Sequence, residues 1–298
     1  MKLIDYLHRA SARLDEAGVS FGHGTTNSFD EAAWLVLWKL ELPLDALDDV
    51  EERELTPAEE TALDALIATR IESRRPAAYL TGEAWLQGVP FTVDERTIVP
   101  RSLIAEVLAE GLIDPWLPAK KSRVLDLCTG NGSLAVLAAM AWPDVAVDGA
   151  DLSADALAVA AINVARHDLK SRITLYQGDG LAAIPRDRRY ELILCNPPYV
   201  NAASMGELPA EFRAEPAMAL AGGADGMDFI RALLSGIRRH LIGEAVLVLE
   251  IGNERENFEA AFPDLEVVWL PTQLTDDAVL LVTRNMLEEG LPKTSKVS

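Results

Sequence analysis

The first 75 residues carry apolar side chains three, four or seven positions apart, the spacing of helices that bury one face. A capping box over Thr56–Glu59, with proline at the first helical position, predicts a helix that ends before Pro76. Ser28 or Asp30 is expected to cap an earlier helix. We therefore predict a small N-terminal helical domain over residues 1–75. Its expected core positions are Ile4, Leu7, Leu14, Trp34, Leu35, Leu37, Trp38, Leu63, Leu66, Ile67 and Ile71.

Residues 76–100 change character, because β-branched and aromatic side chains replace the helical spacing. Gly82 and Gly88 separate the apolar runs. This pattern predicts a β-hairpin that links two domains. The β-type positions are Tyr79, Leu80, Trp85, Phe91, Val93, Ile98 and Val99.

From residue 101 to residue 285, apolar runs typical of buried strands alternate with helical segments. Such alternation predicts the α/β class, with a doubly wound, mostly parallel sheet. The last two strands have only a loop between them, which predicts an antiparallel pair at one edge. Residues 286–298 have no apolar pattern and are expected to form a flexible tail. The predicted strands are 124–127, 145–150, 173–177, 192–195, 245–251, 266–270 and 278–283. The predicted helices are one through Ile104, Val107 and Leu108, then 133–141, 154–168, a short one near 181 and 228–240.

The chain has a net charge of −20, with 47 acidic residues against 27 Lys and Arg residues. A surface of this sign repels phosphate backbones, which disfavours broad nucleic-acid binding. The negative charge favours a basic protein partner. The alternative explanation of the charge is that it only keeps the protein soluble.

The cysteine and histidine content argues against a disulfide-stabilised protein and against a metalloprotein. Cys128 and Cys195 are too few for a disulfide framework, and the four histidines are scattered, so no metal site is expected. The two cysteines end strands that are expected to be neighbours, which predicts two packed thiols. No apolar run approaches the ~18 residues of a membrane span, and the first ten residues are unlike a signal peptide. We therefore expect a cytoplasmic protein without membrane association.

A glycine-rich turn, Gly130-Asn131-Gly132, follows the first strand of the α/β region. Such a turn lets a ligand approach the backbone, and the next helix offers free N–H groups. Asp151 ends the second strand 19 residues after Gly132, where a carboxylate can accept both ribose hydroxyls of a nucleotide-like cofactor. Asp179 ends the third strand and can meet an adenine amino group. All three strand ends are expected to open into one crevice.

The same turn fits the G-x-G-x-x-A dinucleotide fingerprint over 130–135, which is a weak motif by itself. Asp126 precedes the first glycine by four residues, and a carboxylate there suits a cationic amino-acid moiety better than a pyrophosphate. This disfavours a dehydrogenase. A glycine turn without any ligand is the other alternative, which the acidic strand ends disfavour.

A second motif, Asn196-Pro197-Pro198-Tyr199, follows the apolar strand 192–195. Two prolines can simply end a strand, since each removes a backbone donor. With the flanking residues, however, the motif suits a planar –NH2 group. The Asn196 side-chain carbonyl and the Pro197 backbone carbonyl can each accept one N–H, and Tyr199 can pack on the amide. The prolines hold the turn in a fixed shape, which near-attack geometry requires.

Together the two motifs resemble methyltransferases that use S-adenosylmethionine to methylate planar nitrogen on DNA adenine, ribosomal RNA guanine or protein glutamine. The helical front and segments 78–85, 91–96 and 99–102 extend the resemblance to the glutamine methyltransferase family over nearly the whole chain. Release-factor enzymes of that family usually have Pro-Glu-Thr-Glu after the arginine, where this chain has Ser-Leu-Ile-Ala-Glu after Arg101. They also usually have glycine in place of Cys128. At both positions this chain instead resembles the sister branch of the family, which methylates a glutamine of the third large-subunit ribosomal protein.

The resemblance implies a class I methyltransferase-like fold, S-adenosylmethionine as cofactor and a strongly basic ribosomal protein as substrate. It implies that the glutamine is held by Asn196, Pro197, Pro198 and Tyr199. It implies that the cofactor pocket is lined by Asp126, Cys128, Thr129, Gly130, Gly132, Asp151, Asp179, Gly180, Asn196 and Arg101. Arg101 belongs to a segment that resembles the family's lid over the cofactor, and at Cys128 only the backbone is expected to serve.

Residues 1–75 are expected to recognise the protein substrate and to take no part in the chemistry, because every candidate site residue lies after residue 100. Nucleic acid is expected only indirectly, as part of a ribosomal particle. Three alternatives stay open: a release-factor glutamine methyltransferase, an amino-group methyltransferase acting on RNA or DNA, and a non-catalytic interaction protein that retained the fold.

Overall fold

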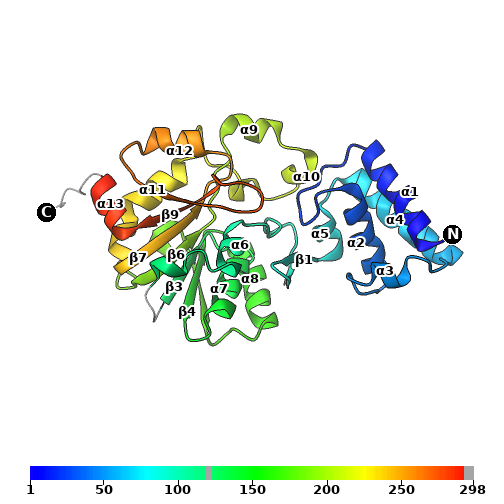
Figure 1. Cartoon of the computed structure of the whole chain (residues 1–298), viewed down its shortest axis with the longest axis horizontal. Helices are drawn as coiled ribbons and strands as arrows, with labels where there is room; N and C mark the ends of the chain where they lie inside the picture. The colour runs from blue at the N-terminus through cyan, green and yellow to red at the C-terminus, as the bar shows by residue number, and fades with distance from the viewer. Residues whose placement is uncertain (118–122, 292–298) are drawn as a thin grey trace.

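The structure is a computed structural model that describes residues 1–117 and 123–291. Figure 1 shows the N-terminal helices at one end of an elongated molecule and the main sheet with its helices at the other. The N-terminal helices are α1 (Leu3–Glu16), α2 (Ser28–Lys39), α3 (Leu47–Val50), α4 (Pro57–Ser73) and α5 (Ala77–Thr81). Their apolar stripes meet in one core, whose fully buried members include Leu3, Leu7, Leu14, Leu35, Leu63 and Ile67.

The N-termini of α4 and α2 test the capping residues that the sequence predicts. The predicted capping box at α4 is confirmed, because Thr56 Oγ1 accepts the Glu59 N–H and a Glu59 carboxylate oxygen accepts the Thr56 N–H. The predicted caps of α2 are wrong: Asn27 caps this helix by accepting the N–H of Asp30. The hydroxyl of Ser28 is engaged elsewhere, since it donates to the carboxylate of Asp15.

The hairpin is shorter than the sequence predicts. Strands β1 (Glu83–Leu86) and β2 (Val89–Thr92) pair antiparallel, but Tyr79 and Leu80 belong to the short helix α5. Pro76 precedes this helix and Gly82 ends it in a left-handed conformation (φ 73°), so proline and glycine define a helical turn where side-chain type predicted a strand.

Seven strands form the main sheet, in the order β5-β4-β3-β6-β7-β9-β8. The first five are parallel, whereas β9 runs antiparallel to both β7 and β8. The predicted class and the antiparallel edge pair are therefore confirmed. The chain order reverses beside β3, and such a switch point opens a crevice at the carboxyl ends of the strands. The strands are β3 (Arg123–Leu127), β4 (Ala146–Asp151), β5 (Ile173–Gln177), β6 (Tyr190–Cys195), β7 (Leu241–Glu250), β8 (Val268–Leu270) and β9 (Val279–Thr283).

Two apolar cores lie on the two faces of this sheet, because alternate strand residues point to opposite sides. Helices α6 (Ile104–Ala109), α7 (Ser133–Ala141) and α8 (Ala154–Arg166) pack on one face. Helices α11 (Asp228–Gly236), α12 (Arg255–Ala261) and α13 (Arg284–Gly290) pack on the other. Short 3-10 turns complete the connections: η1 (Asp114–Trp116), η2 (Gly180–Ala183), η3 (Ala217–Ala219) and η4 (Ile237–His240).

Three further helices lie where the sequence analysis placed none: α12, and two that follow the Asn-Pro-Pro-Tyr motif, α9 (Ala202–Glu207) and α10 (Ala210–Arg213). The expected tail also needs correction, because residues 284–290 form α13. Thr283 caps this helix, and Leu287 is fully buried while Met286 packs on the same apolar core, so these contacts anchor the segment. Residues 292–298 of the expected tail lie outside the described residues.

Candidate active site

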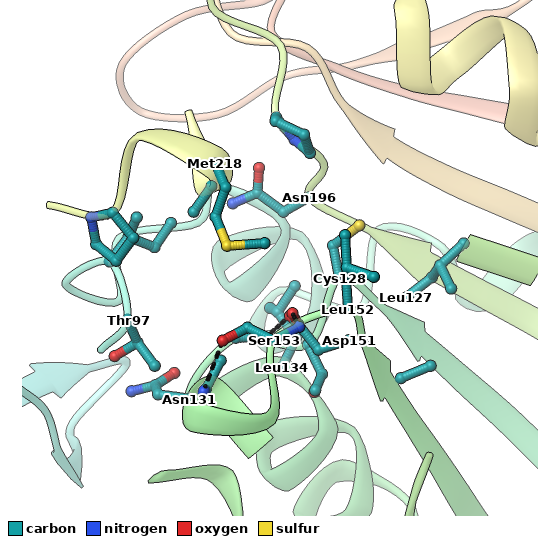
Figure 2. A pocket seen from close by; sticks show the side chains of 18 of the residues that line it. Thr97, Leu127, Cys128, Asn131, Leu134, Asp151, Leu152, Ser153, Asn196 and Met218 are labelled. Carbon is teal, nitrogen blue, oxygen red and sulfur yellow. Dashed lines mark hydrogen bonds between the residues drawn. The ribbon is translucent and has the colours of Figure 1, made fainter. Parts of the chain in front are cut away.

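A cavity opens at the carboxyl ends of β3 to β6, where the sequence predicts the cofactor crevice (Figure 2). The glycine-rich turn after β3 forms its floor, and residues 96–102 wall it from the side of the hairpin. The structure thus brings together nine of the candidate residues on one cavity wall: Arg101, Cys128, Thr129, Gly130, Asp151, Asp179, Gly180, Asn196 and Pro198.

Asp151 is held in place at the end of β4 by two backbone donors. Its Oδ2 accepts the N–H of Gly130 at 2.9 Å, and its Oδ1 accepts the N–H of Ser153 at 2.9 Å. Each oxygen keeps a second acceptor position, and the side chain lines the cavity. The carboxylate is therefore oriented to accept two hydroxyl groups, as a ribose would offer them.

Two expected cavity residues lie behind the wall instead. Asp126 is fully buried, with Oδ2 accepting the Thr129 hydroxyl at 2.5 Å and the Ala135 N–H at 2.9 Å. Burial raises the pKa of Asp126 to about 7. A Cβ on Gly132 would lie 3.1 Å from Ala160, so this glycine allows α7 to approach α8. Neither residue lines the cavity, and both shape the glycine-rich turn that does.

Cys128 occupies a strained position. Its φ of 61° is left-handed, which costs a non-glycine residue about 1–2 kcal/mol. Its neighbour Cys195 lies at the end of the adjacent strand, with Leu127 and Cys195 in register, and both thiols are free. A hydrogen bond with Cys195 and burial raise the pKa of the Cys128 thiol well above its ordinary value. The Cys128 thiol is therefore protonated, and it packs in the same apolar cluster as Cys195.

Two polar groups on the cavity wall lack partners among the described residues. Thr97 Oγ1 and Asn131 Nδ2 are buried without a hydrogen bond, and both side chains face the cavity (Figure 2). Unpaired buried polar groups are rare in proteins. Phe229 lies beside Gly180 at the other part of the wall. These features together fit S-adenosylmethionine, which carries ribose, amino-acid and adenine groups. Asp151 can accept hydroxyl groups, the unpaired polar groups can bind polar atoms, and the aromatic side chain offers an apolar face.

A second cavity adjoins the first and shares four residues with it: Ile98, Arg101, Asn196 and Ala219. Pro197 and Tyr199 line only this second cavity, and Pro198 lines only the first. Asn196 therefore stands at the junction of the two cavities. We call the second cavity the substrate cavity.

Tyr199 is fixed by close packing and by a carboxylate. A Cβ on Gly252 would lie 2.5 Å from the Tyr199 ring, so only glycine allows this approach. The Tyr199 hydroxyl donates to Glu250 Oε1 at 3.2 Å, while Glu250 Oε2 accepts the Ser102 hydroxyl at 2.5 Å. Burial raises the pKa of Glu250 above its ordinary value, although these donors lower it. Glu250 thus ties the Asn-Pro-Pro-Tyr turn to the segment that walls the cofactor cavity.

Arg101 separates the two cavities and is held by a buried carboxylate. Its guanidinium donates to both oxygens of Glu215, at 2.6 and 2.7 Å, and to the carbonyl of Val99 at 3.0 Å. It also lies 5.3 Å from the ring centroid of Phe212. Burial alone would raise the pKa of Glu215, but the neighbouring His23 and Arg101 lower it below its ordinary value, so this residue is a carboxylate.

Comparison with known proteins decides the family. Residues 105–223 match the model of the methyltransferase small domain. A ribosomal protein uL3 glutamine methyltransferase of Bordetella pertussis is 54% identical over 96% of both chains, and that of Burkholderia pseudomallei is 54% identical over 93% of both. The chain belongs to the family of ribosomal protein uL3 glutamine methyltransferases. Among solved structures, the crystal structure of a methyltransferase from Pyrococcus furiosus has a TM-score of 0.48 at 15% identity, covering 67% of this chain and 90% of that one.

Membership of the uL3 methyltransferase family confirms the resemblance to the sister branch and the dependence on S-adenosylmethionine. It also removes the dehydrogenase alternative that the glycine-rich turn left open. Within residues 1–117 and 123–291, no helix has both the length and the apolar character needed to cross a bilayer.

Three polar residues beside the cavities of this uL3-family enzyme were missed from the sequence. Glu250 carries a usable signal, since it ends the predicted strand 245–251 at the same edge as the other acidic residues. Glu215 lies in the short connection between α10 and η3, outside any sequence motif, and His23 comes from the N-terminal region. For these two, the contact exists only across the fold, so no local pattern indicates it.

Replacing Asp151 with alanine is expected to weaken S-adenosylmethionine binding about 10-fold or more, since hydrogen bonds to a charged group are worth about 1.5–3 kcal/mol. Titration calorimetry measures this directly. Asp155→Ala is the matched control, because Asp155 is exposed on the next helix and does not line the cavity. Equal affinities in the two variants would contradict the ribose role of Asp151.

Proposed function

We propose that this chain transfers a methyl group from S-adenosylmethionine to the side-chain amide nitrogen of a glutamine in ribosomal protein uL3. The observation that carries the proposal is the place of Asn196 at the junction of the cofactor and substrate cavities. An amide bound to Asn196 from the substrate cavity would direct its nitrogen toward the cofactor. The names of relatives that match along almost the whole chain support the same substrate.

Residues of the substrate cavity perform the binding and orienting steps. Bound S-adenosylmethionine would supply an electrophilic methyl group on its sulfonium. The Asn196 side-chain oxygen and the Pro197 carbonyl accept the two N–H groups of the glutamine amide and so fix its plane. Neither acceptor titrates, so the site activates the nitrogen by orientation and hydrogen bonding rather than by a catalytic base.

The other candidate residues keep their proposed roles in the cofactor cavity. Asp151 receives the ribose and Asp179 the adenine amino group, while Cys128, Thr129, Gly130 and Gly180 line the cavity through the turns that carry them. Arg101 closes the wall between cofactor and glutamine. Because Asp126 and Gly132 lie behind this wall, we assign them to its support.

The N-terminal region supports recognition of a basic partner, because residues 1–75 hold 16 acidic and 8 basic residues. Opposite charge speeds the encounter of two proteins, and added salt slows it. We propose that residues 1–75 contribute to uL3 recognition and that residues 101–285 carry the transfer, with the hairpin region 76–100 between them. Since its substrate is a ribosomal protein, we also place the enzyme in the cytoplasm.

Incubation with methyl-labelled S-adenosylmethionine and purified uL3, release factors, ribosomal RNA or DNA tests the function. We expect label on uL3 alone, and mass spectrometry should locate it on one glutamine side chain. Label on a release factor would instead support the release-factor alternative, and label on nucleic acid the amino-group alternative. The Asn196→Ala protein serves as the inactive control in each reaction.

A further inference from the structure

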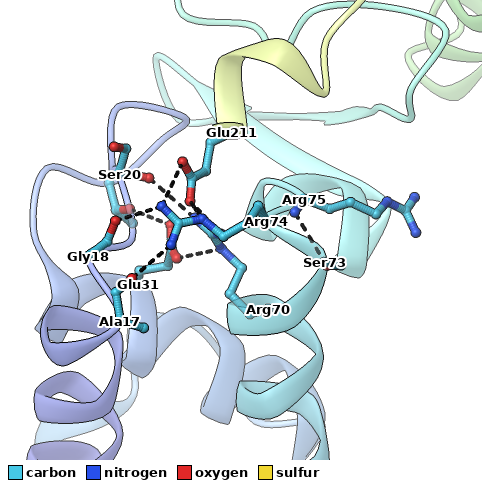
Figure 3. A network of polar contacts seen from close by, with 10 residues as sticks. Ala17, Gly18, Ser20, Glu31, Arg70, Ser73, Arg74, Arg75 and Glu211 are labelled. Atoms are coloured by element: carbon cyan, nitrogen blue, oxygen red, sulfur yellow. Dashed lines mark hydrogen bonds and ion pairs between the residues drawn. The ribbon is translucent and has the colours of Figure 1, made fainter. Parts of the chain in front are cut away.

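Helix α10 and the residues just after it join the N-terminal helices to the substrate cavity. Glu211 is fully buried and forms ion pairs with Arg70 of α4 at 3.3 Å and with Arg74, which directly follows α4, at 2.7 Å (Figure 3). The next residue, Phe212, lines the substrate cavity. Glu215 follows and holds Arg101. One short segment therefore contacts the N-terminal domain on one side and both cavities on the other.

The loop that carries His23 is fixed by the same two arginines. Arg74 donates to the carbonyl oxygens of residues 17 and 18, at 2.9 and 2.6 Å, and Arg70 donates to the carbonyl of Ser20 at 3.3 Å. Figure 3 shows this loop and the start of α10 meeting at the arginine side chains. Arg70 and Arg74, at the end of α4 and just after it, thus fix the position of the loop before α2 relative to α10.

His23 projects from this loop onto the segment after α10. Only 1% of its surface is exposed, and its ring lies 4.2 Å from that of Phe212 between centroids. Gly22 and Gly24 flank it with φ values of 119° and 107°, which side chains rarely adopt, so the backbone bends sharply to deliver the histidine. Packing alone does not explain this placement, because any apolar ring would fill the space without burying polar atoms.

The polar atoms of His23 point to Glu215. The Nε2 atom lies 3.6 Å from Glu215 Oε1, and neither ring nitrogen has a hydrogen-bond partner among the described residues. Glu215 Oε1 also accepts the Val99 N–H at 2.8 Å and an Arg101 N–H at 2.6 Å. A buried imidazole without hydrogen bonds costs free energy. Its position is therefore best explained by an electrostatic contact that restrains the Glu215 carboxylate.

We propose that His23 is a positioning residue for methyl transfer, which fixes Glu215 and Phe212 and thereby the Arg101 wall between the cofactor and the glutamine. The inference rests on the proposed function. It changes the role of the N-terminal domain, which the sequence analysis confined to substrate recognition. No residue of 1–75 lines either cavity, but His23 from that region supports Phe212 and Glu215 from behind the wall of the substrate cavity.

The variant His23→Phe keeps an aromatic ring against Phe212 and removes both ring nitrogens. We expect kcat/KM for uL3 to fall about 10-fold, because a small displacement of the cavity wall misplaces the amide, while the Kd of S-adenosylmethionine changes less than about two-fold. His8→Phe is the matched control: His8 is exposed in the same domain and packs on Phe29 at 5.4 Å between centroids. It should leave the kinetics unchanged.

A double-mutant cycle separates positioning from general stabilisation. If His23 acts through Glu215, the protein with His23→Phe and Glu215→Gln should lose no more kcat/KM than Glu215→Gln alone. Additive losses would overturn the proposal. So would a lowered Tm with wild-type kcat/KM at temperatures where the variant is folded, because that result would make His23 a purely structural residue.

A measurement without turnover keeps this proposal distinct from the proposed function. Hydrogen exchange followed by mass spectrometry should show faster exchange over residues 208–215 in His23→Phe than in His8→Phe. Equal exchange in the two proteins would overturn the positioning role. Failure of the wild-type protein to methylate uL3 would contradict the proposed function instead, whatever the exchange shows.

Discussion

Replacing Asn196 with alanine is expected to slow methyl transfer to uL3 about 100-fold, the range of a lost hydrogen bond that acts in the transition state. Asn196 stands where the two cavities meet. Under the proposed function, its carbonyl is an acceptor that fixes the glutamine nitrogen beside the methyl donor. In its absence the amide can rotate, and the Pro197 carbonyl alone holds it. Affinity for S-adenosylmethionine should change much less, since Asp151 and the glycine-rich turn remain in place.

Single-turnover rates and titration calorimetry measure the two effects of Asn196→Ala separately. Asn201→Ala is the matched control, because this second asparagine of the same loop lies outside both cavities, where its side chain caps α9 and donates to Glu254 at 2.7 Å. Its methyl-transfer rate should match the wild type. Equal losses of rate and of cofactor affinity in Asn196→Ala would assign Asn196 to cofactor binding rather than to the substrate amide.

Replacing Arg70 with methionine is expected to destabilise the protein by about 3–5 kcal/mol, the cost of leaving buried charges without a partner. Arg70 is fully buried, donating to Glu31 at 2.8 Å and to Glu211 at 3.3 Å (Figure 3). Both carboxylates are almost inaccessible to water. Burial raises the pKa of Glu31, and Arg70 opposes that rise, so removing Arg70 leaves a carboxylate that water cannot stabilise.

Urea denaturation measures the free energy of unfolding of Arg70→Met and of the control Arg75→Met. The control makes the same substitution just after the end of the same helix. Arg75 pairs with Glu95 on the surface, with side-chain exposures of 42% and 66%, so its loss should cost less than about 1 kcal/mol. Adding Glu31→Gln to Arg70→Met should recover part of the stability, because one uncompensated charge is removed. A similar small cost for both single variants would contradict the buried-network explanation.

The same network changes the expected result of removing residues 1–75. The sequence analysis treated this region as separable from the chemistry. In the structure, Glu211 would lose Arg70 and Arg74, and Glu215 would lose His23. The truncated chain would therefore carry Glu211 without its arginine partners beside the substrate cavity, while Glu215 would keep Arg101. Point variants such as His23→Phe are the cleaner test of what the N-terminal domain contributes.

Local chemistry was sufficient to predict most of the strands and helices, and the strand ends that meet at one cavity. The capping box of α4 and the apolar stripes of the N-terminal helices depend on side chains within one or two turns. The alternation of strands and helices determines a parallel sheet, and parallel strands bring their carboxyl ends to one edge. Asp151, Asp179 and Asn196 could therefore be placed together without knowledge of any side-chain contact, because each ends a strand or follows one directly.

Contacts between distant segments were decided only by the tertiary structure. Asp126 and Gly132 belong to the predicted turn, yet which of its atoms face the cavity depends on how α7 packs against β3 and α8. His23, Glu215 and Arg101 meet although up to 192 positions separate them in the chain, because α4 and α10 hold their loops together. Ion pairs of this kind follow from burial, and burial is a property of the packed fold. The sequence by itself therefore determined the chemistry at the strand ends, while the packing of the N-terminal helices on residues 211–215 decided which further side chains support the wall of the substrate cavity.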